Sequence, residues 1–292
     1  DVRGFAARAG GELTLPALTT FLHDTATNNR QATFIAEGAT SHLNFPVLTT
    51  FTSNTTQNSQ VTMQATFGGQ IDFGALKSFG GGNVDIVASG PDSTINFSAL
   101  TTVPAGRTRF ESCGGASHLG FDQLQSATHT GFEAFEGAVI SLPKMTQFSH
   151  PEPPNNQQAL LTADGAGSTI DAPALTALAP TLVSNARIQM RASAGGLLDL
   201  SSVATINDGL YSIMSEGAGS KVDLTSLTTA THAGTSAQEV SPITVQTDGL
   251  LALNPGTTNL QHVNVLMTGG GRITGGTINL NGRSSLTADG QI

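Results

Sequence analysis

The sequence predicts an all-β protein, a parallel β-helix (β-solenoid) of about ten coils of roughly 21–30 residues, with three short strands in each coil. Three observations support this fold class. A nine-residue phrase recurs along the chain, an alternating apolar stretch and a glycine turn precede it, and no segment keeps a 3.6-residue period for the length of a helix. A phrase repeated at 20–50-residue spacing is typical of a solenoid.

The phrase reads apolar-x-apolar-Pro/Ser-x-Leu-Thr-x-apolar, as in LTLPALTTF (13–21), INFSALTTV (95–103) and VDLTSLTTA (222–230). A tenth, degraded copy begins near Leu251. The nine clear copies begin at Leu13, Leu43, Ile71, Ile95, Leu119, Ile140, Ile170, Leu198 and Val222.

A glycine turn precedes the phrase, as in GATSHLNF (38–45) and GAGSTIDA (165–172), and alternating stretches such as VTMQA (61–65) come before the turn. Each coil is therefore predicted to contain an alternating strand, a glycine turn, a second strand, a Pro/Ser corner, a third strand and a loop. Stacked coils pair each strand with its equivalents above and below, which satisfies backbone groups that one coil alone could not.

Equivalent apolar positions should form interior columns, and phenylalanine fills two of them in the first half of the chain. All 14 phenylalanines lie at or before Phe148, and aliphatic residues fill the later coils. The repeat crosses this point in phase, so we expect a single solenoid domain over residues 1–292. The two predicted columns are Phe45, Phe73, Phe97 and Phe121, and Phe21, Phe51, Phe79 and Phe148.

Composition excludes some function classes. Only 12 residues are Lys or Arg and the net charge is −9, which argues against a nucleic-acid groove. No apolar run approaches the roughly 20 residues of a membrane span. The single cysteine, Cys113, excludes an internal disulfide framework. Repeat patterns reach both ends without a capping segment, so we expect a segment of a longer protein, or end coils that stack on other copies.

One outward column contains Asp171, Asp199 and Asp223 in successive coils. Carboxylates one strand spacing apart repel one another, and oxygen ligands suit calcium, so the three residues are candidate metal ligands. The alternative is a row of solvated carboxylates bonded to nearby hydroxyls or backbone. We expect no other cofactor.

A second candidate metal site is the pair His129 and His150, which occupy the same position in adjacent coils. The alternative is two solvent-exposed loop histidines. A column of threonines, including Thr19, Thr49 and Thr101, could form an ordered outward ladder of the kind found in ice-binding solenoids, although Lys77 and other residues interrupt it.

The pattern between Leu13 and Leu253 resembles the right-handed parallel β-helix proteins, the pectate-lyase-like superfamily and its bacterial surface relatives. Many members cleave acidic polysaccharides, and others are extracellular adhesins or autotransporter passengers. The resemblance implies a secreted or cell-surface bacterial protein whose partners are surface polysaccharide or a host surface. It rests on architecture, so it assigns no catalytic residue.

The residues that catalysis on this fold requires are sparse. A lyase needs a strong base and a group that neutralises a uronate. The arginines that could serve form two groups about three coils apart, Arg107 with Arg109 and Arg187 with Arg191. We therefore expect a structural or adhesive stalk, fibre or adhesin segment without catalytic activity. The alternatives are a polysaccharide lyase or hydrolase, a noncatalytic carbohydrate-binding module and, more remotely, an ice-binding solenoid.

Overall fold

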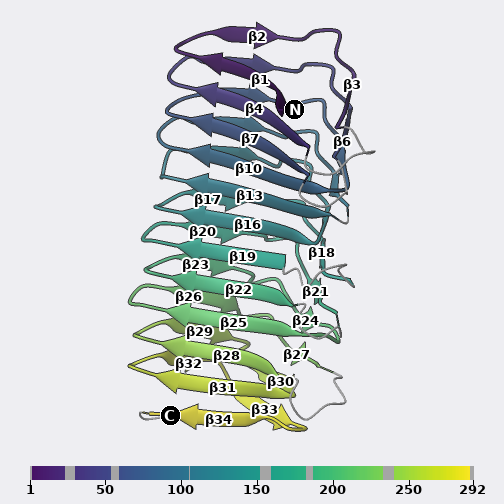
Figure 1. The fold of residues 1–292 in the computed structure, drawn as a ribbon. Helices are drawn as coiled ribbons and strands as arrows, with labels where there is room; N and C mark the ends of the chain where they lie inside the picture. Colours follow the sequence, from purple (N-terminus) through teal and green to yellow (C-terminus); the bar gives the residue numbers. More distant parts are fainter. Residues whose placement is uncertain are drawn as a thin grey trace.

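The computed structural model describes residues 2–23, 30–53, 59–104, 106–151, 159–181, 187–232 and 240–289. Within these ranges every regular element is a β-strand, and no helix there could span a membrane. The coils stack along one axis into a rod, with the two termini at opposite ends (Figure 1). The predicted fold class, a parallel β-solenoid, is confirmed.

The strands form four sheets, here called A to D. Sheet A contains β1 (Val2–Arg8), β4 (Gln31–Glu37), β7 (Gln60–Thr66), β10 (Asn83–Ser89), β13 (Arg107–Cys113), β16 (Thr130–Phe135), β19 (Ala159–Asp164), β22 (Ile188–Ser193), β25 (Tyr211–Glu216), β28 (Ser241–Gln246), β31 (Val263–Thr268) and β34 (Ser285–Ala288). Sheet B contains β2 (Glu12–Thr14), β5 (His42–Asn44), β8 (Gln70–Asp72), β11 (Thr94–Asn96) and β14 (His118–Gly120). Sheet D contains β17 (Val139–Ser141), β20 (Thr169–Asp171), β23 (Leu197–Asp199), β26 (Lys221–Leu224), β29 (Leu250–Leu253) and β32 (Arg272–Thr274). Sheet C contains β3 (Thr20–Leu22), β6 (Thr50–Thr52), β9 (Ser78–Gly80), β12 (Thr102–Val103), β15 (Ser126–Thr128), β18 (Gln147–Ser149), β21 (Ala177–Ala179), β24 (Thr205–Ile206), β27 (Thr229–Ala230), β30 (Thr257–Gln261) and β33 (Thr277–Asn281).

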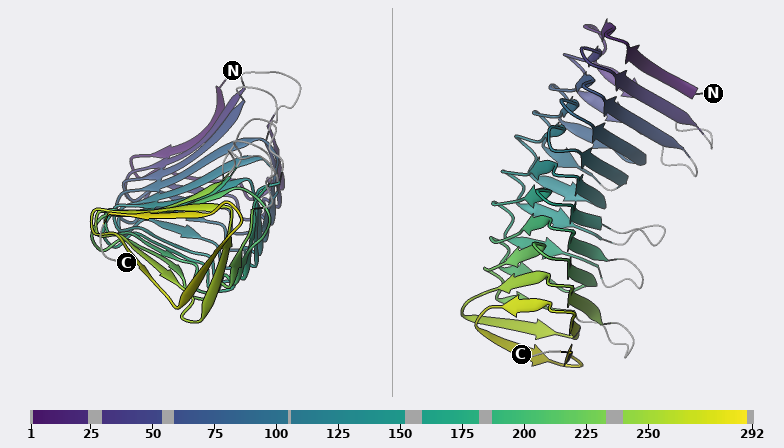
Figure 2. Two further views of the ribbon diagram at one scale, coloured as in Figure 1. Left: turned by 90° about the horizontal axis from the view of Figure 1, so that it is seen from below. Right: turned by 90° about the vertical axis from the view of Figure 1, so that its left-hand side faces the viewer.

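The sheets make three walls around one core (Figure 2). Sheet A is the first wall and sheet C the third. Sheets B and D together form the second wall, because β14 of sheet B contacts β17 of sheet D. Each coil passes from sheet A to sheet B or D and then to sheet C, and the ladders within each sheet are parallel, as β4 with β7 and β20 with β23 show.

One coil more is present than the phrase predicts. The strands β31, β32 and β33 form an eleventh coil, and β34 adds a further strand to sheet A. The segment from Arg272 to Asn281 reads RITGGTINLN, which lacks the Pro/Ser corner and the Leu-Thr pair. Pairing with the coil before it places these strands in the solenoid, and that information is not in the phrase.

The predicted phenylalanine columns are confirmed as interior columns. Phe73 is fully buried, and its ring stacks on Phe45 at 5.0 Å and on Phe97 at 5.5 Å, each with planes only 9° apart. Phe121 continues the stack at 5.9 Å from Phe97. Offset rings at one-strand spacing gain attraction beyond their area burial, so this column ties four coils together.

Two kinds of glycine turn, long and short, connect sheet A with the second wall, and a serine of a long turn binds the short turn of the preceding coil at several places. Ser168, in a long turn, donates to the Asp164 carbonyl at 2.7 Å and accepts from the Gly137 N–H of the preceding short turn at 2.9 Å. In short turns the close approach of coils requires glycine: a Cβ on Gly196 would lie 2.2 Å from the Ala163 carbonyl oxygen. These turns therefore hold each coil against the next one along the rod.

Candidate functional site

The predicted aspartate column is present on the outer side of sheet D. The register pairs Asp171 with Asp199 and Asp199 with Asp223 across β20, β23 and β26. The Asp171 and Asp199 residues are partly exposed, whereas Asp223 is 9% exposed. The sequence therefore places all three residues correctly.

Two of the three carboxylates stabilise the corner that follows them. Asp199 Oδ1 accepts a hydrogen bond from the Ser201 N–H at 3.0 Å, and Asp223 Oδ1 accepts one from the Thr225 N–H at 3.1 Å. This contact, from a side chain to the N–H two residues on, is an Asx-turn. Asp171 precedes Pro173, which has no N–H to donate.

The same rule explains the column beyond the aspartates. Asp72 caps the N–H of Gly74 at 2.7 Å and Asn96 caps that of Ser98 at 2.9 Å. Asn44 instead precedes Pro46, and its buried Oδ1 has no hydrogen-bond partner among the described residues. Most coils therefore turn this corner with a proline or with an Asx cap, which accounts for much of the Pro/Ser variation in the repeated phrase; the coil with Gly120 and Asp122 has neither at these positions.

Electrostatics distinguish the members of the aspartate column. Burial and the charge of Asp199 raise the pKa of Asp171. For Asp223 burial acts in the same direction, but hydrogen bonds from Lys221 and Thr225 outweigh it and lower the pKa. The Lys221 ammonium lies 2.7 Å from Asp223 Oδ2. The predicted repulsion between carboxylates therefore remains between Asp171 and Asp199, whereas Lys221 neutralises the charge of Asp223.

Among the described residues, no three His, Cys, Asp or Glu side chains come together in the way a metal ion requires. The contacts of Asp199 and Asp223 match the alternative given above, carboxylates bonded to backbone. Calcium binding by this column stays a prediction, tested below.

The two predicted histidines meet in the interior and not in exposed loops. His129 is 5% exposed and His150 is fully buried, and their rings pack edge to face with centroids 4.7 Å apart. His129 Nε2 contacts the Pro151 carbonyl. The edge of one ring points at the face of the other, and the two rings together fill the corner between sheet C and sheet A. The expectation of exposed loop histidines is wrong, because the position after the third strand still faces inward.

A similar histidine pair lies near the C-terminal end, where His232 and His262 face each other with centroids 6.3 Å apart. His262 Nδ1 donates to the His232 carbonyl at 2.5 Å. Both His129 and His262 have left-handed backbone, with φ of 50° and 53°, and each alone joins a sheet C strand to a sheet A strand. A histidine at a one-residue corner, packed on a histidine of an adjacent coil, is thus a repeated structural device.

An ion-pair network on the outer face of sheet A is the densest cluster of charge that the structure describes in detail. Arg109 Nε and Nη2 bind the two oxygens of Glu133 at 2.5 Å and 3.2 Å, and Nη2 also lies 2.6 Å from Glu111 Oε2. Hydrogen bonding to Glu133 raises the pKa of the Arg109 guanidinium. Asp85 adds a third carboxylate and is hydrogen-bonded by Gln60.

Sequence reasoning named Arg109 but missed its partners. Arg109, Glu111 and Glu133 occupy outward positions of β13 and β16, so alternation together with strand register could have found them. The two arginine groups do lie three coils apart, with β16 and β19 between β13 and β22, as predicted.

A shallow hollow of about 440 Å³ opens beside this network, between Arg109, Phe135 and Asp164. Cys113 also lines it, and burial together with a hydrogen bond to Glu136 raises the pKa of this thiol. A raised pKa keeps the sulfur protonated at neutral pH, and a protonated thiol is a poor nucleophile.

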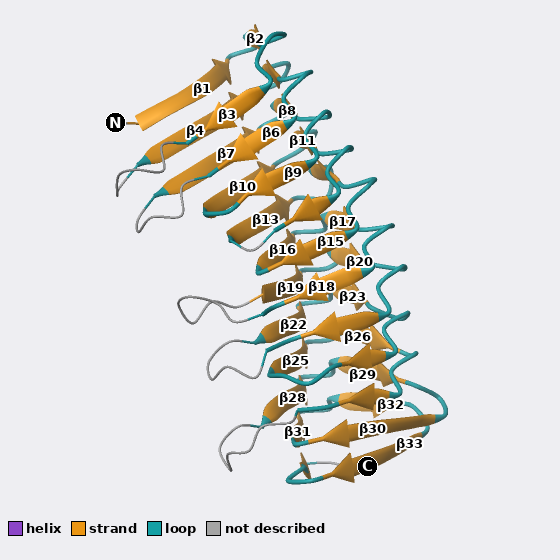
Figure 3. Ribbon diagram, turned by 90° about the vertical axis from the view of Figure 1, so that its right-hand side faces the viewer, coloured by secondary structure: helices purple, strands orange, loops and turns teal. Residues whose placement is uncertain are grey.

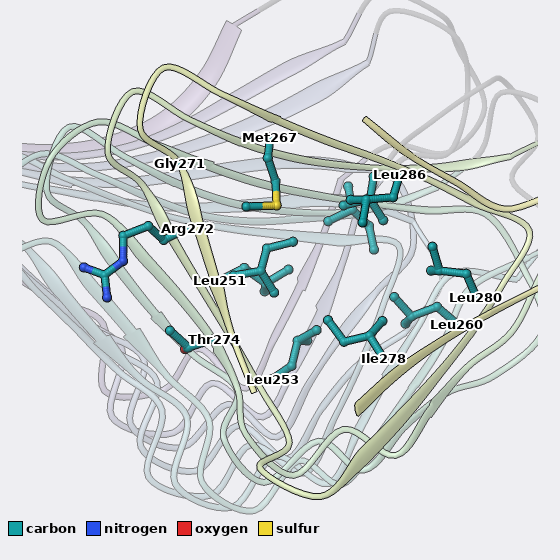
Figure 4. A pocket seen from close by; sticks show the side chains of 13 residues that line it. Leu251, Leu253, Leu260, Met267, Gly271, Arg272, Thr274, Ile278, Leu280 and Leu286 are labelled. Atoms are coloured by element: carbon teal, nitrogen blue, oxygen red, sulfur yellow. The ribbon is translucent and has the colours of Figure 1, made fainter. Parts of the chain in front are cut away.

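A second cavity, of about 360 Å³, opens at the C-terminal end of the core. Figure 4 shows Leu251, Leu253 and Leu286 around it; the first two belong to β29 of sheet D and Leu286 belongs to β34 of sheet A. Its lining is mostly apolar, with Arg272 and Thr274 as the polar members, and Leu286 is 42% exposed. The last coil therefore presents an open section of the core.

The predicted threonine column is present and outward. Thr101 and Thr228 donate hydrogen bonds to the carbonyl oxygens of Lys77 and Ala204 in the preceding coils, at 3.1 Å and 3.0 Å. Lys77, Gln125 and Ala204 interrupt the column, as the sequence predicts. These hydroxyls thus brace successive coils.

No protein-family model, no curated protein and no solved structure matches this chain.

Proposed function

We propose that the chain is a structural and adhesive β-solenoid segment of a secreted or cell-surface bacterial protein, a stalk, fibre or adhesin segment without catalytic activity. The observation that carries the proposal is the continuous ladder: sheet A runs through 12 strands and sheet C through 11 in an unbroken parallel order. One apolar core extends from the first coil to the last. Such a ladder makes a stiff spacer, because every coil supports its neighbours.

Three of the residues that the sequence offered for chemistry have structural contacts that account for them. Asp199 and Asp223 cap corners, and Arg109 is bound by two carboxylates. The low charge content, 11%, and the abundance of hydroxyl and amide side chains support an extracellular setting.

The proposed partner at the C-terminal end is a further coil of the same repeat. The cavity there is lined by core residues of three walls, and a coil stacked on it would continue the inward column that ends at Leu286 and begins at Phe5. Such a coil could come from a second copy or from a longer form of the chain.

Small-angle scattering together with light scattering over a range of concentrations tests this proposal. We expect a rod in every sample, and end-to-end growth that Leu286→Asp abolishes, whereas Thr162→Asp on the side of the rod leaves it unchanged. End-to-end association of the 292-residue chain supports stacking of separate copies. If a longer form of the chain does not associate in this way, the result supports further coils of the same chain. A compact particle contradicts the rod.

The alternative function is a polysaccharide lyase or hydrolase, and the cluster around Arg109 and the hollow beside it favour that alternative. We expect no release of unsaturated or reducing sugars from pectin, alginate or chondroitin. Turnover that disappears on Arg109→Ala or Asp199→Asn, but persists on Arg191→Ala, would make the enzyme the better interpretation.

A further inference from the structure

The outer face of sheet C is free of charge. None of its 11 described strands contains an Asp, Glu, Lys, Arg or His residue. Figure 3 looks toward the side of the rod that carries several of these strands, from β3 and β6 to β30 and β33. The outward residues include Thr20, Thr50, Thr52, Ser78, Thr102, Ser126, Thr128, Gln147, Ser149, Thr205, Thr229, Asn259, Gln261, Asn279 and Asn281. We call this surface the sheet C wall.

Charge is placed elsewhere on the same protein. The outer face of sheet A carries Arg109, Glu111 and Glu133 in its middle, and Arg8 paired with Glu37 near the N-terminal end. Charges flank the sheet C wall at Lys77, before β9, at Asp208, after β24, and at Arg283, after β33. Exposed strand positions accept charge on sheet A, so the stacking of coils does not itself exclude charge from sheet C.

The sheet C wall is also periodic. Strand register places Thr50 beside Thr20 and Ser78 beside Thr50, and similar pairs follow along the rod. Equivalent groups are therefore about 4.8 Å apart, the spacing of neighbouring strands. At the wall's margin the hydroxyls of Thr101 and Thr228 donate to carbonyls within the rod, which leaves their oxygen lone pairs facing outward as acceptors.

These two properties restrict the partner. A charged partner, such as an acidic polysaccharide or an anionic membrane, would gain no Coulomb attraction from this wall. A folded protein without a repeat of its own has no periodic row of groups to place against these hydroxyls and amides. A neutral polysaccharide is uncharged and carries the same hydroxyls in every unit along its length.

We propose that the sheet C wall binds a neutral polysaccharide lying along the rod. Each hydrogen bond to an exposed hydroxyl contributes little in water, but many equivalent contacts on one rigid rod add by avidity. The inference rests on the proposed adhesive function and names the class of surface to which the segment adheres.

Co-sedimentation with insoluble cellulose, chitin or β-1,3-glucan tests the proposal, and retardation in native gels that contain soluble pectin or alginate gives the acidic comparison. We expect at least one neutral polymer to sediment the protein, with a bound fraction that is the same at low and high salt. Binding that salt abolishes, or that only the acidic polymers show, overturns the proposal.

Matched variants locate the surface. Three outward threonines of the sheet C wall are changed to lysine in one variant, and three outward threonines of sheet A in the control. We expect at least a ~10-fold loss of binding in the wall variant and no loss in the control. The two sets are Thr50, Thr102 and Thr229 for the wall, and Thr62, Thr162 and Thr244 for sheet A.

The other possible results also decide whether the sheet C wall is the binding surface. Equal loss in both variants overturns the assignment to the wall, as does failure of all three neutral polymers to bind. Inhibition of ice growth that the wall variant loses, without polysaccharide binding, assigns the wall to ice instead. If the triple wall variant does not melt like the native protein, Thr50→Lys and Thr62→Lys replace the two sets. Scattering on the same samples reports the rod shape separately, so failure of wall binding leaves the rod proposal intact.

Discussion

Replacing Phe73 with alanine should destabilise the solenoid more than any replacement of an exposed phenylalanine. The Phe73 side chain is fully buried between Phe45 and Phe97, and its edge meets Phe34 at 5.7 Å. The variant therefore leaves a cavity in the wall of rings and removes three aromatic contacts.

The expected cost follows from these contacts. Deleting a buried phenylalanine side chain costs about 3–5 kcal/mol, and the upper half of that range fits a ring with three aromatic neighbours, each pair contributing about 0.5–1.5 kcal/mol beyond its buried area. Phe73→Leu keeps most of the volume and should cost about 1–2 kcal/mol. Phe67→Ala is the control, because this side chain is 68% exposed, and its effect should stay within about 0.5 kcal/mol.

Chemical denaturation of the three variants measures these costs, and hydrogen exchange locates them. Because each coil contacts only its neighbours, protection in β8 and β11 should fall before protection in distant coils does. A change below about 1 kcal/mol for Phe73→Ala, or a change as large for Phe67→Ala, would show that the column does not hold the coils together.

Three further predictions concern polar positions. Asp171→Asn should raise the melting temperature at neutral pH, because the raised pKa of Asp171 means that its ionised form destabilises the fold above that pKa. The gain should vanish as the pH falls through the pKa of Asp171. An equal gain at all pH values would refute this explanation. Millimolar calcium should not raise the melting temperature, whereas a rise of several degrees that Asp199→Asn removes would establish the aspartate column as a calcium site. Ser168→Ala should cost about 1–3 kcal/mol because it leaves the Gly137 N–H unpaired and removes one of the two hydrogen bonds that the Asp164 carbonyl accepts, the other coming from the Glu136 N–H. Thr169→Ala, a partly exposed neighbour, should cost less than about 0.5 kcal/mol in the same denaturation assay.

Much of the fold could be predicted because each copy of the phrase places the same kinds of residue in the same environments. A position that is apolar in every copy must face inward, so the columns of Phe45 and Phe51 follow from alignment alone. The eleventh coil could not be predicted in this way. Its strands β32 and β33 lack the phrase, and their place depends on backbone pairing with β29 and β30, which constrains no particular side chain.

The candidate site was predictable in position but not in role. Alignment puts Asp171, Asp199 and Asp223 in one column, yet only the chemistry two residues later, a proline or an N–H donor, decides what each carboxylate does. The histidines show the opposite problem. Alignment predicts their column but places it in an exposed loop, whereas in the structure the inward face extends one corner further and includes His129 and His150.

Our proposal places binding on the sheet C wall and not in a pocket because of how the structural constraints are distributed over the coil. Core columns occupy the inward positions of the coils, and prolines, Asx caps and turn serines occupy many of the corners, so those residues carry structural constraints that any rod of this kind would share. Outward strand positions escape these constraints, as the charged network on sheet A shows. Eleven successive strands of sheet C nevertheless avoid charge and keep small hydroxyl and amide side chains at most outward positions. Folding does not require that restriction, so it points to what the wall contacts, and a partner that is uncharged and periodic along the rod meets both of its features.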